Sequence, residues 1–98
     1  MKNDVKQIKT ILDQRINLLR KKYNVKTLGV FGSIARGDNT QASDIDILVE
    51  FSQPIGLFKF IELENYLGSI LGKKVDLVTK KALKDAIKDN ILKEVIYV

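Results

Sequence analysis

Two aspartates, Asp44 and Asp46, occupy alternate positions at the start of the apolar segment 45–49. In an extended chain alternate side chains lie on one face, so both carboxylates face one way while Ile45 and Ile47 face the core. Carboxylates about 5 Å apart repel by roughly 3 kcal/mol at an effective dielectric constant near 20. A bound divalent cation would remove this repulsion, and Mg²⁺ prefers oxygen ligands. The pattern therefore predicts a magnesium site.

A glycine–serine pair, Gly32 and Ser33, directly follows the apolar segment 27–31. Where a buried strand turns into a short helix, free backbone N–H groups suit a phosphate. A phosphate-binding turn beside a cation site suggests a nucleoside triphosphate as ligand. The alternative is an ordinary turn in which Ser33 only caps the helix.

A third aspartate, Asp76, lies thirty residues after Asp46, inside the apolar segment 74–78. A helical crossover would let the segments 45–51 and 74–78 lie parallel and adjacent, which brings Asp76 beside Asp46. Taken singly, each of these aspartates is equally compatible with a solvent-facing position. Their joint occurrence at matched strand ends favours a functional site.

These motifs occur together in a fixed order and spacing. They are Gly32-Ser33 with Arg36-Gly37, then Ser43-Asp44-Ile45-Asp46, then Val75-Asp76-Leu77. The set resembles the nucleotidyltransferase signature of the DNA polymerase β superfamily, and within it the minimal nucleotidyltransferases (MNT), over nearly the whole chain. The resemblance implies a polymerase β-like nucleotidyltransferase fold and transfer of a nucleoside monophosphate from a triphosphate, with pyrophosphate leaving.

The resemblance also implies a role for each matched residue. Asp44 and Asp46 would hold two Mg²⁺ ions, and Asp76 would ligate one of them and accept the proton of the attacking hydroxyl. Gly32 and Ser33 would hold the terminal phosphates. Arg36 would supply positive charge or orient the turn; alternatively it pairs with Asp38 or Glu50.

Members of the resembled family are commonly paired with a helical HEPN-domain protein. We therefore expect a Mg-dependent protein adenylyltransferase that moves AMP from ATP to a tyrosine of a HEPN ribonuclease toxin and so acts as its antitoxin in a hetero-oligomer. One alternative is a nucleotide-binding antitoxin that neutralises its partner by binding alone. Another is a transferase acting on a small-molecule hydroxyl, which the lack of an acceptor-binding domain disfavours.

Composition limits the classes of protein that the chain can represent. Its 98 residues, 45% of them hydrophobic, suffice for one domain spanning 1–98. The chain has no cysteine and no histidine, which excludes disulfides, thiolate or zinc–histidine sites and a Ser-His nucleophile pair within it. Neither a secretion signal nor an apolar segment long enough to cross a bilayer is present, so we expect a cytoplasmic protein without membrane contact.

The net charge of +5 is unevenly distributed. Segments 1–31 and 73–98 have more bases than acids, whereas segment 32–72 has two bases and six acids. An acidic centre within a basic surround would attract a triphosphate. Individual lysines are equally compatible with solvated helix ends. The basic residues are not interleaved with aromatic ones, so nucleic-acid binding is not expected.

Hydrophobic periodicity predicts a small mixed α/β sheet with helices. The expected helices are 4–22, capped by Asn3 or Asp4, a short one ending near Gly37, 56–71 ending at Gly72, and one or two turns within 80–94; the expected strands are 27–31, 45–51 and 74–78, with a short extended piece at 95–98. In helix 56–71 we expect Leu57, Phe60, Ile61, Leu67 and Leu71 to form the core-facing side. We expect Phe31, Phe58 and Phe60 in the core, and the three tyrosines with buried rings.

Overall fold

The computed structural model describes residues 4–98, so Asn3 lies outside the described residues. The elements, in chain order, are α1 (Val5–Tyr23), β1 (Val25–Phe31), α2 (Gly32–Arg36), β2 (Ile45–Phe51), α3 (Leu57–Leu71), β3 (Val75–Thr79), the 3₁₀ turn η1 (Lys80–Ala82), α4 (Asp85–Glu94) and β4 (Ile96–Tyr97).

The four strands form one mixed sheet in the order β3-β2-β1-β4. β1 pairs antiparallel with both β2 and β4, whereas β2 and β3 are parallel. The connection from β1 to β2, residues 32–44, reverses the chain direction, whereas the longer connection through α3 provides the crossover between the parallel strands β2 and β3. The predicted mixed α/β sheet is confirmed.

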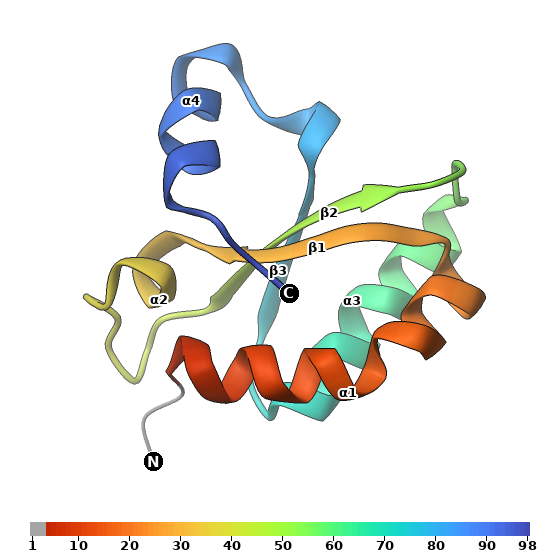
Figure 1. Ribbon diagram of the computed structural model, residues 1–98, viewed down its shortest axis with the longest axis horizontal. Coiled ribbons are helices and arrows are strands. Elements are labelled where there is room, and N and C mark those ends of the chain that lie inside the picture. The colour runs from red at the N-terminus through yellow and green to blue at the C-terminus, as the bar shows by residue number, and fades with distance from the viewer. Residues whose placement is uncertain (1–3) are drawn as a thin grey trace.

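Helices cover the two faces of this sheet unequally (Figure 1). α1 and α3 pack on one face and enclose the larger core, in which Ile45 and Ile47 are fully buried. The other face has a small cluster of Phe31, Leu48 and Leu83, covered by apolar residues of α4. The predicted alternation along β2 is therefore confirmed, with isoleucines under α1 and α3 and the intervening residues on the face of α4.

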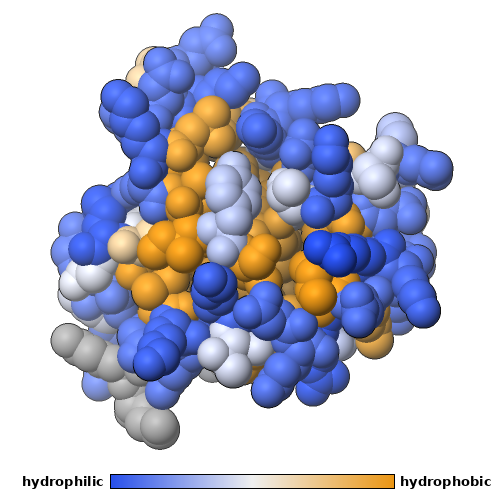
Figure 2. Space-filling model, viewed as in Figure 1, coloured by the Kyte–Doolittle hydropathy of each residue, from blue (hydrophilic) through white to orange (hydrophobic). Residues whose placement is uncertain are grey.

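Apolar side chains also reach the surface on the side where the chain ends. Figure 2 shows a group of hydrophobic residues between α4 and α1, where the C-terminal segment crosses the sheet, with hydrophilic residues on the surrounding helices. β4 pairs with Gly29 and Val30 of β1 there. A side chain at Gly29 would overlap Val95, so this glycine allows the C-terminal segment to lie close to β1.

Local sequence signals explain the two ends of α1 and the end of α3. The Asp4 carboxylate accepts a hydrogen bond of 2.8 Å from the backbone N–H of Gln7, which satisfies one of the free donors at the start of α1. α1 ends where Asn24 adopts a left-handed conformation with φ 55°, and α3 ends at Gly72 with φ 68°. The predicted Asp4 cap and Gly72 stop are confirmed.

Other boundaries differ from the sequence prediction. β1 begins two residues earlier than expected, because Val25 is buried and pairs with Phe51. β3 is shifted by one residue, to Val75–Thr79. The expected helical segment 80–94 divides into η1 and α4. The short extended piece expected within 95–98 is β4.

The predicted core-facing side of α3 was partly wrong. Leu67 and Leu71 are buried as expected, but Leu57 and Ile61 are 71% and 43% exposed. Both side chains lie on the solvent-facing side of the helix, whereas Phe60 packs partly buried against the core and Leu63 is fully buried in it. Leu57 and Ile61 thus have the helical spacing of core residues but are exposed.

Two aromatic predictions were also wrong. Phe58 is 88% exposed and Tyr97 is 43% exposed, whereas Phe31 and Tyr23 are buried as expected. Phe58 lies on the outward side of the same exposed first turn of α3. Tyr97 belongs to the edge strand β4, which has no neighbour on its outer side.

No helix within residues 4–98 combines the length and apolar composition needed to span a bilayer.

Replacement of Leu67 by Ala tests the larger core. Leu67 is fully buried in the cluster beneath α1 and α3, so the substitution leaves a cavity. We expect the free energy of unfolding to fall by about 2–5 kcal/mol, measured by chemical denaturation. Leu57→Ala, in the same helix but 71% exposed, is the matched control and should change it by less than about 0.5 kcal/mol. Equal losses in both variants would contradict this packing.

Candidate active site

The sheet register brings two of the three predicted aspartates together. Asp46 near the start of β2 is the direct partner of Asp76 in the parallel strand β3. Neighbouring strands lie about 4.8 Å apart, and residues in register present their side chains on the same face. Both face the side of the sheet that α4 covers only in part. The sequence expectation that Asp76 lies beside Asp46 is confirmed.

Gly32 makes room for the carboxylate of Asp46. Phe31, the last residue of β1, pairs with Asp46, so the chain turns into α2 directly over this side chain. A Cβ on Gly32 would overlap Asp46 Oδ2 and would lie 3.0 Å from its Cγ. Gly32 also has φ +75°, which side chains disfavour. Both the backbone conformation and the space therefore require glycine.

Negative charge accumulates around Asp46. Burial in the half-covered face raises the pKa of the Asp46 carboxyl above its ordinary value of 3.8, and the nearby charges of Asp76 and Asp44 raise it further. Arg36 acts in the opposite direction, and Glu94 adds a smaller increase. The ionised form of Asp46 is thus destabilised, and a bound cation would relieve this destabilisation.

Asp44 is the least constrained of the three aspartates. It directly precedes β2, its side chain is 45% exposed, and its Oδ2 lies 4.0 Å from Nζ of Lys74. Across residues 4–98 no three acidic side chains converge closely enough to form a ready-made metal cluster. The structure thus brings Asp46 and Asp76 together, with Asp44 near them but oriented toward Lys74.

The chemistry of this donor set fits a hard divalent cation. All candidate ligands are carboxylate oxygens, the kind that Mg²⁺ prefers. Burial and the neighbouring charges of Asp76 and Asp44 raise the pKa of Asp46, and Asp44 is held only by a long, exposed ion pair that contributes little. Rotation of the exposed Asp44 side chain away from Lys74 is the adjustment that a three-carboxylate site would need.

Arg36 has a structural partner that the sequence did not reveal. Its Nε lies 3.2 Å from Asp38, and its Nη1 lies 3.2 Å from Glu94 of α4. Hydrogen bonds to these two carboxylates raise the pKa of Arg36. The expected pairing of Arg36 with Asp38 is confirmed, whereas the alternative pairing with Glu50 does not occur. Glu94 is 58 residues away in sequence, so no local pattern signals this contact.

The Arg36 contacts favour the second of its two expected roles. The carboxylates of Asp38 and Glu94 compensate the guanidinium charge. The ion pair with Glu94 connects α2 to α4. The backbone of the turn is closed by the N–H of Asp38, which donates to the carbonyl of Ser33 at 3.0 Å. The Arg36 guanidinium thus bridges Asp38, which follows this turn, and Glu94 of α4.

Replacement of Gly32 by Ala tests the contact with Asp46. Gly37 is a matched control, because it has a similar φ of +81° but open space around its Cα. Gly37→Ala should lower the free energy of unfolding by about 1–2 kcal/mol through backbone strain alone. Gly32→Ala should lower it further because Asp46 must move. Equal losses in the two variants, measured by thermal unfolding, would show that the carboxylate does not occupy this space.

Replacement of Asp46 by Asn tests the charge accumulation. Because the folded-state pKa is raised, ionised Asp46 destabilises the fold above that pKa, and protonation removes the cost as the pH falls through it. Without divalent cations, Asp46→Asn should therefore raise Tm at pH 7 by a few degrees, and the gain should vanish below about pH 3.8. Asp13→Asn, on the exposed side of α1, is the control; a gain that persists at low pH would contradict the electrostatic cause.

Comparison with known proteins agrees with this geometry. A family model described as "Nucleotidyltransferase domain" matches residues 5–98. A relative named protein adenylyltransferase MntA, from Thermococcus cleftensis, is 47% identical over 94 residues, covering 96% of this chain and 95% of the relative. A solved structure described as a minimal nucleotidyltransferase is 29% identical, covers 96% of this chain and 95% of its own, and superposes with a TM-score of 0.80.

A further structural relative is a chain of a toxin–antitoxin complex determined with AMP-PNP. It is 27% identical with a TM-score of 0.71, and the match covers 87% of this chain and 69% of that one. The family match spans nearly all of the chain and includes the Gly32 turn and the three aspartates. This chain belongs to the nucleotidyltransferase domain family.

Proposed function

We propose that this protein transfers AMP from ATP to a hydroxyl of a partner protein, a tyrosine of a HEPN-domain toxin, and thereby acts as its antitoxin. The observation that carries the proposal is the pairing of Asp46 with Asp76 beside the Gly32 turn, where burial and neighbouring carboxylates destabilise the ionised form of Asp46. The name of the Thermococcus relative supports protein adenylylation, and the toxin–antitoxin complex with AMP-PNP supports a toxin partner and a nucleotide substrate.

Asp44, Asp46 and Asp76 are the residues that would hold Mg²⁺. Bound Mg²⁺ would neutralise the charge on the departing pyrophosphate and would lower the pKa of the attacking hydroxyl. The raised pKa of Asp46 supports this assignment, because a cation stabilises the ionised carboxylate that burial and its neighbours destabilise.

The chain's own residues would bind the nucleotide and accept the proton. The Gly32 backbone and the half-buried Ser33 lie at the turn where the terminal phosphates would bind, and Arg36 holds this turn against α4. The acceptor oxygen bonds to the α-phosphorus as the bond from phosphorus to the pyrophosphate oxygen breaks. Asp76, exposed beside Asp46, accepts the hydroxyl proton in the same step.

Incubation of the toxin partner with this protein, ATP and Mg²⁺ tests the proposal. We expect intact-mass measurement to show the toxin heavier by whole AMP units and peptide mapping to place AMP on tyrosine. The double variant Asp44→Asn and Asp46→Asn should lose roughly three orders of magnitude in transfer rate while remaining folded, since it loses only carboxylate charge.

Asp13→Asn, on α1, is the matched control and should retain full activity. Neutralisation of the toxin without any mass change would favour the alternative antitoxin that acts by binding alone. Retention of transfer by the double variant would contradict the assignment of Asp44 and Asp46.

A further inference from the structure

A cavity lies at the end of β2 and β3 opposite Asp46 and Asp76. Its volume is about 620 Å³, and it is bounded by the end of β2, the following loop, the first turn of α3, η1 and α4. Along a strand, Glu50 is about 13 Å from Asp46, and Thr79 is about 10 Å from Asp76. The cavity is thus separate from the aspartates but within the reach of a short extended peptide.

Apolar side chains form one part of this cavity. Phe51 and Phe60 pack edge to face with ring centroids 6.3 Å apart, and both line the cavity. Leu57 lines it as well and is 71% exposed, so its side chain is available to a ligand. The cavity therefore offers a site into which an apolar side chain can be inserted.

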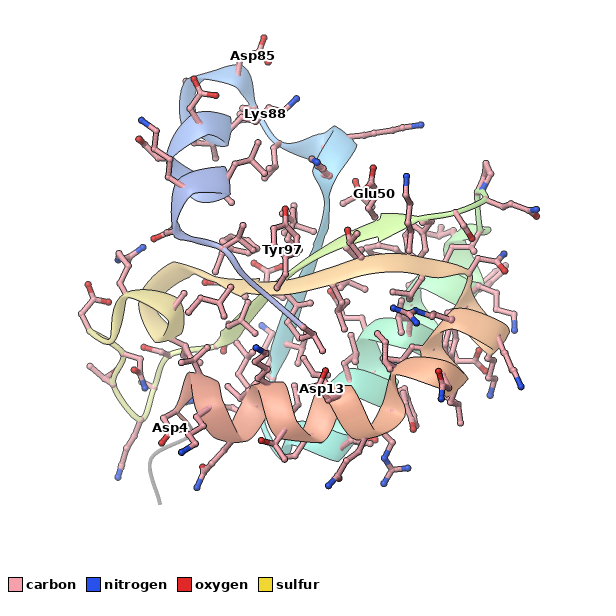
Figure 3. All side chains as sticks on the ribbon, viewed as in Figure 1. Asp4, Asp13, Glu50, Asp85, Lys88 and Tyr97 are labelled. Atoms are coloured by element: carbon pink, nitrogen blue, oxygen red, sulfur yellow. The ribbon has the colours of Figure 1, made fainter. Side chains whose placement is uncertain are left out.

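Three lysines from two further elements line the same cavity. Lys80 and Lys81 come from η1 and Lys88 from α4, and Lys80 and Lys88 are half-buried. Figure 3 shows Lys88 extending from α4 on the side of the molecule where Glu50 rises from the end of β2. Three lysines from η1 and α4 thus line the same cavity as the apolar residues of β2 and α3.

These lysines lack compensating charges. Within residues 4–98 none of the three has its ammonium group within 4.0 Å of a carboxylate. Glu50 is the one acidic residue lining the cavity, and its Oε1 accepts a hydrogen bond of 3.4 Å from the hydroxyl of Thr27. An excess of positive charge beside apolar surface is complementary to a ligand that combines carboxylates with an apolar side chain.

We propose that this lysine-rimmed cavity binds an acidic segment of the acceptor protein, with an apolar side chain against Phe51, Leu57 and Phe60 and carboxylates near Lys80, Lys81 and Lys88. The proposal rests on the function proposed above. Three or four extended residues span the 10–13 Å to the aspartates, so a docked segment places a neighbouring hydroxyl at the reacting phosphate. Docking of this kind supplies acceptor recognition from a surface outside the reacting groups.

Steady-state kinetics with the HEPN toxin as acceptor test the proposal. The double variant Lys80→Glu and Lys88→Glu should raise KM for the toxin about tenfold or more, with kcat and the KM for ATP unchanged, because only acceptor binding is lost. Lys6→Glu with Lys9→Glu, on exposed positions of α1, changes the net charge equally and should leave all constants at the wild-type values. The charge-preserving pair Lys80→Arg and Lys88→Arg should retain most of the toxin affinity.

Each departure from this pattern overturns the docking proposal. Equal KM values for the toxin in the two Glu variants would show that only net charge matters, and a raised KM for ATP instead would assign the cavity to nucleotide. Absence of transfer by the wild-type protein would reject the proposed function itself, which is a distinguishable result.

Carbodiimide cross-linking of the wild-type complex provides a test independent of variant folding. This reagent joins amines to carboxylates that are in contact. We expect cross-links from Lys80 or Lys88 to Asp or Glu of the toxin, in a segment close in sequence to the modified tyrosine. Cross-links confined to other lysines of this chain would overturn the proposal.

Discussion

The contact between the Asp46 carboxylate and the Cα of Gly32 is the constraint on which the candidate site depends. Antiparallel pairing of Phe31 with Asp46 places the turn after β1 directly over this carboxylate. Only a residue without a side chain, with φ +75°, allows the chain to pass. The Gly32 turn, proposed to bind the phosphates, and the carboxylates thereby lie next to each other, as the proposed transfer from a triphosphate requires.

The unequal covering of the sheet explains how a small domain accommodates this charge. The larger core under α1 and α3 buries the isoleucines that alternate with the aspartates, so β2 is held firmly from one side. The other face has only a small apolar cluster beneath α4. Asp46 is consequently half-buried, enough to raise its pKa while leaving it accessible to a ligand. Arg36 and Glu94 hold α4 against the turn without covering the carboxylates.

The same two strands carry different surfaces at their two ends. At one end lie the carboxylates and the Gly32 turn, and at the other lie three lysines around an apolar cavity. Opposite charges at the two ends separate a site suited to cations and phosphates from one suited to acidic groups. In a one-sheet domain, strand length alone provides the 10–13 Å that keeps the two surfaces distinct.

The sequence by itself determined the elements whose signals are local. Alternating Ile and Asp residues defined the faces of β2, Asp4 and Gly72 marked helix ends, and the β-branched segment around Asp76 predicted a strand parallel to β2. Tertiary structure alone decided which residues meet over long separations, such as Arg36 with Glu94. It also decided which apolar residues of α3 remain exposed, such as Leu57. Periodicity reports which side of an element is apolar, whereas the partner of a charged group and the area available for burial depend on how elements pack.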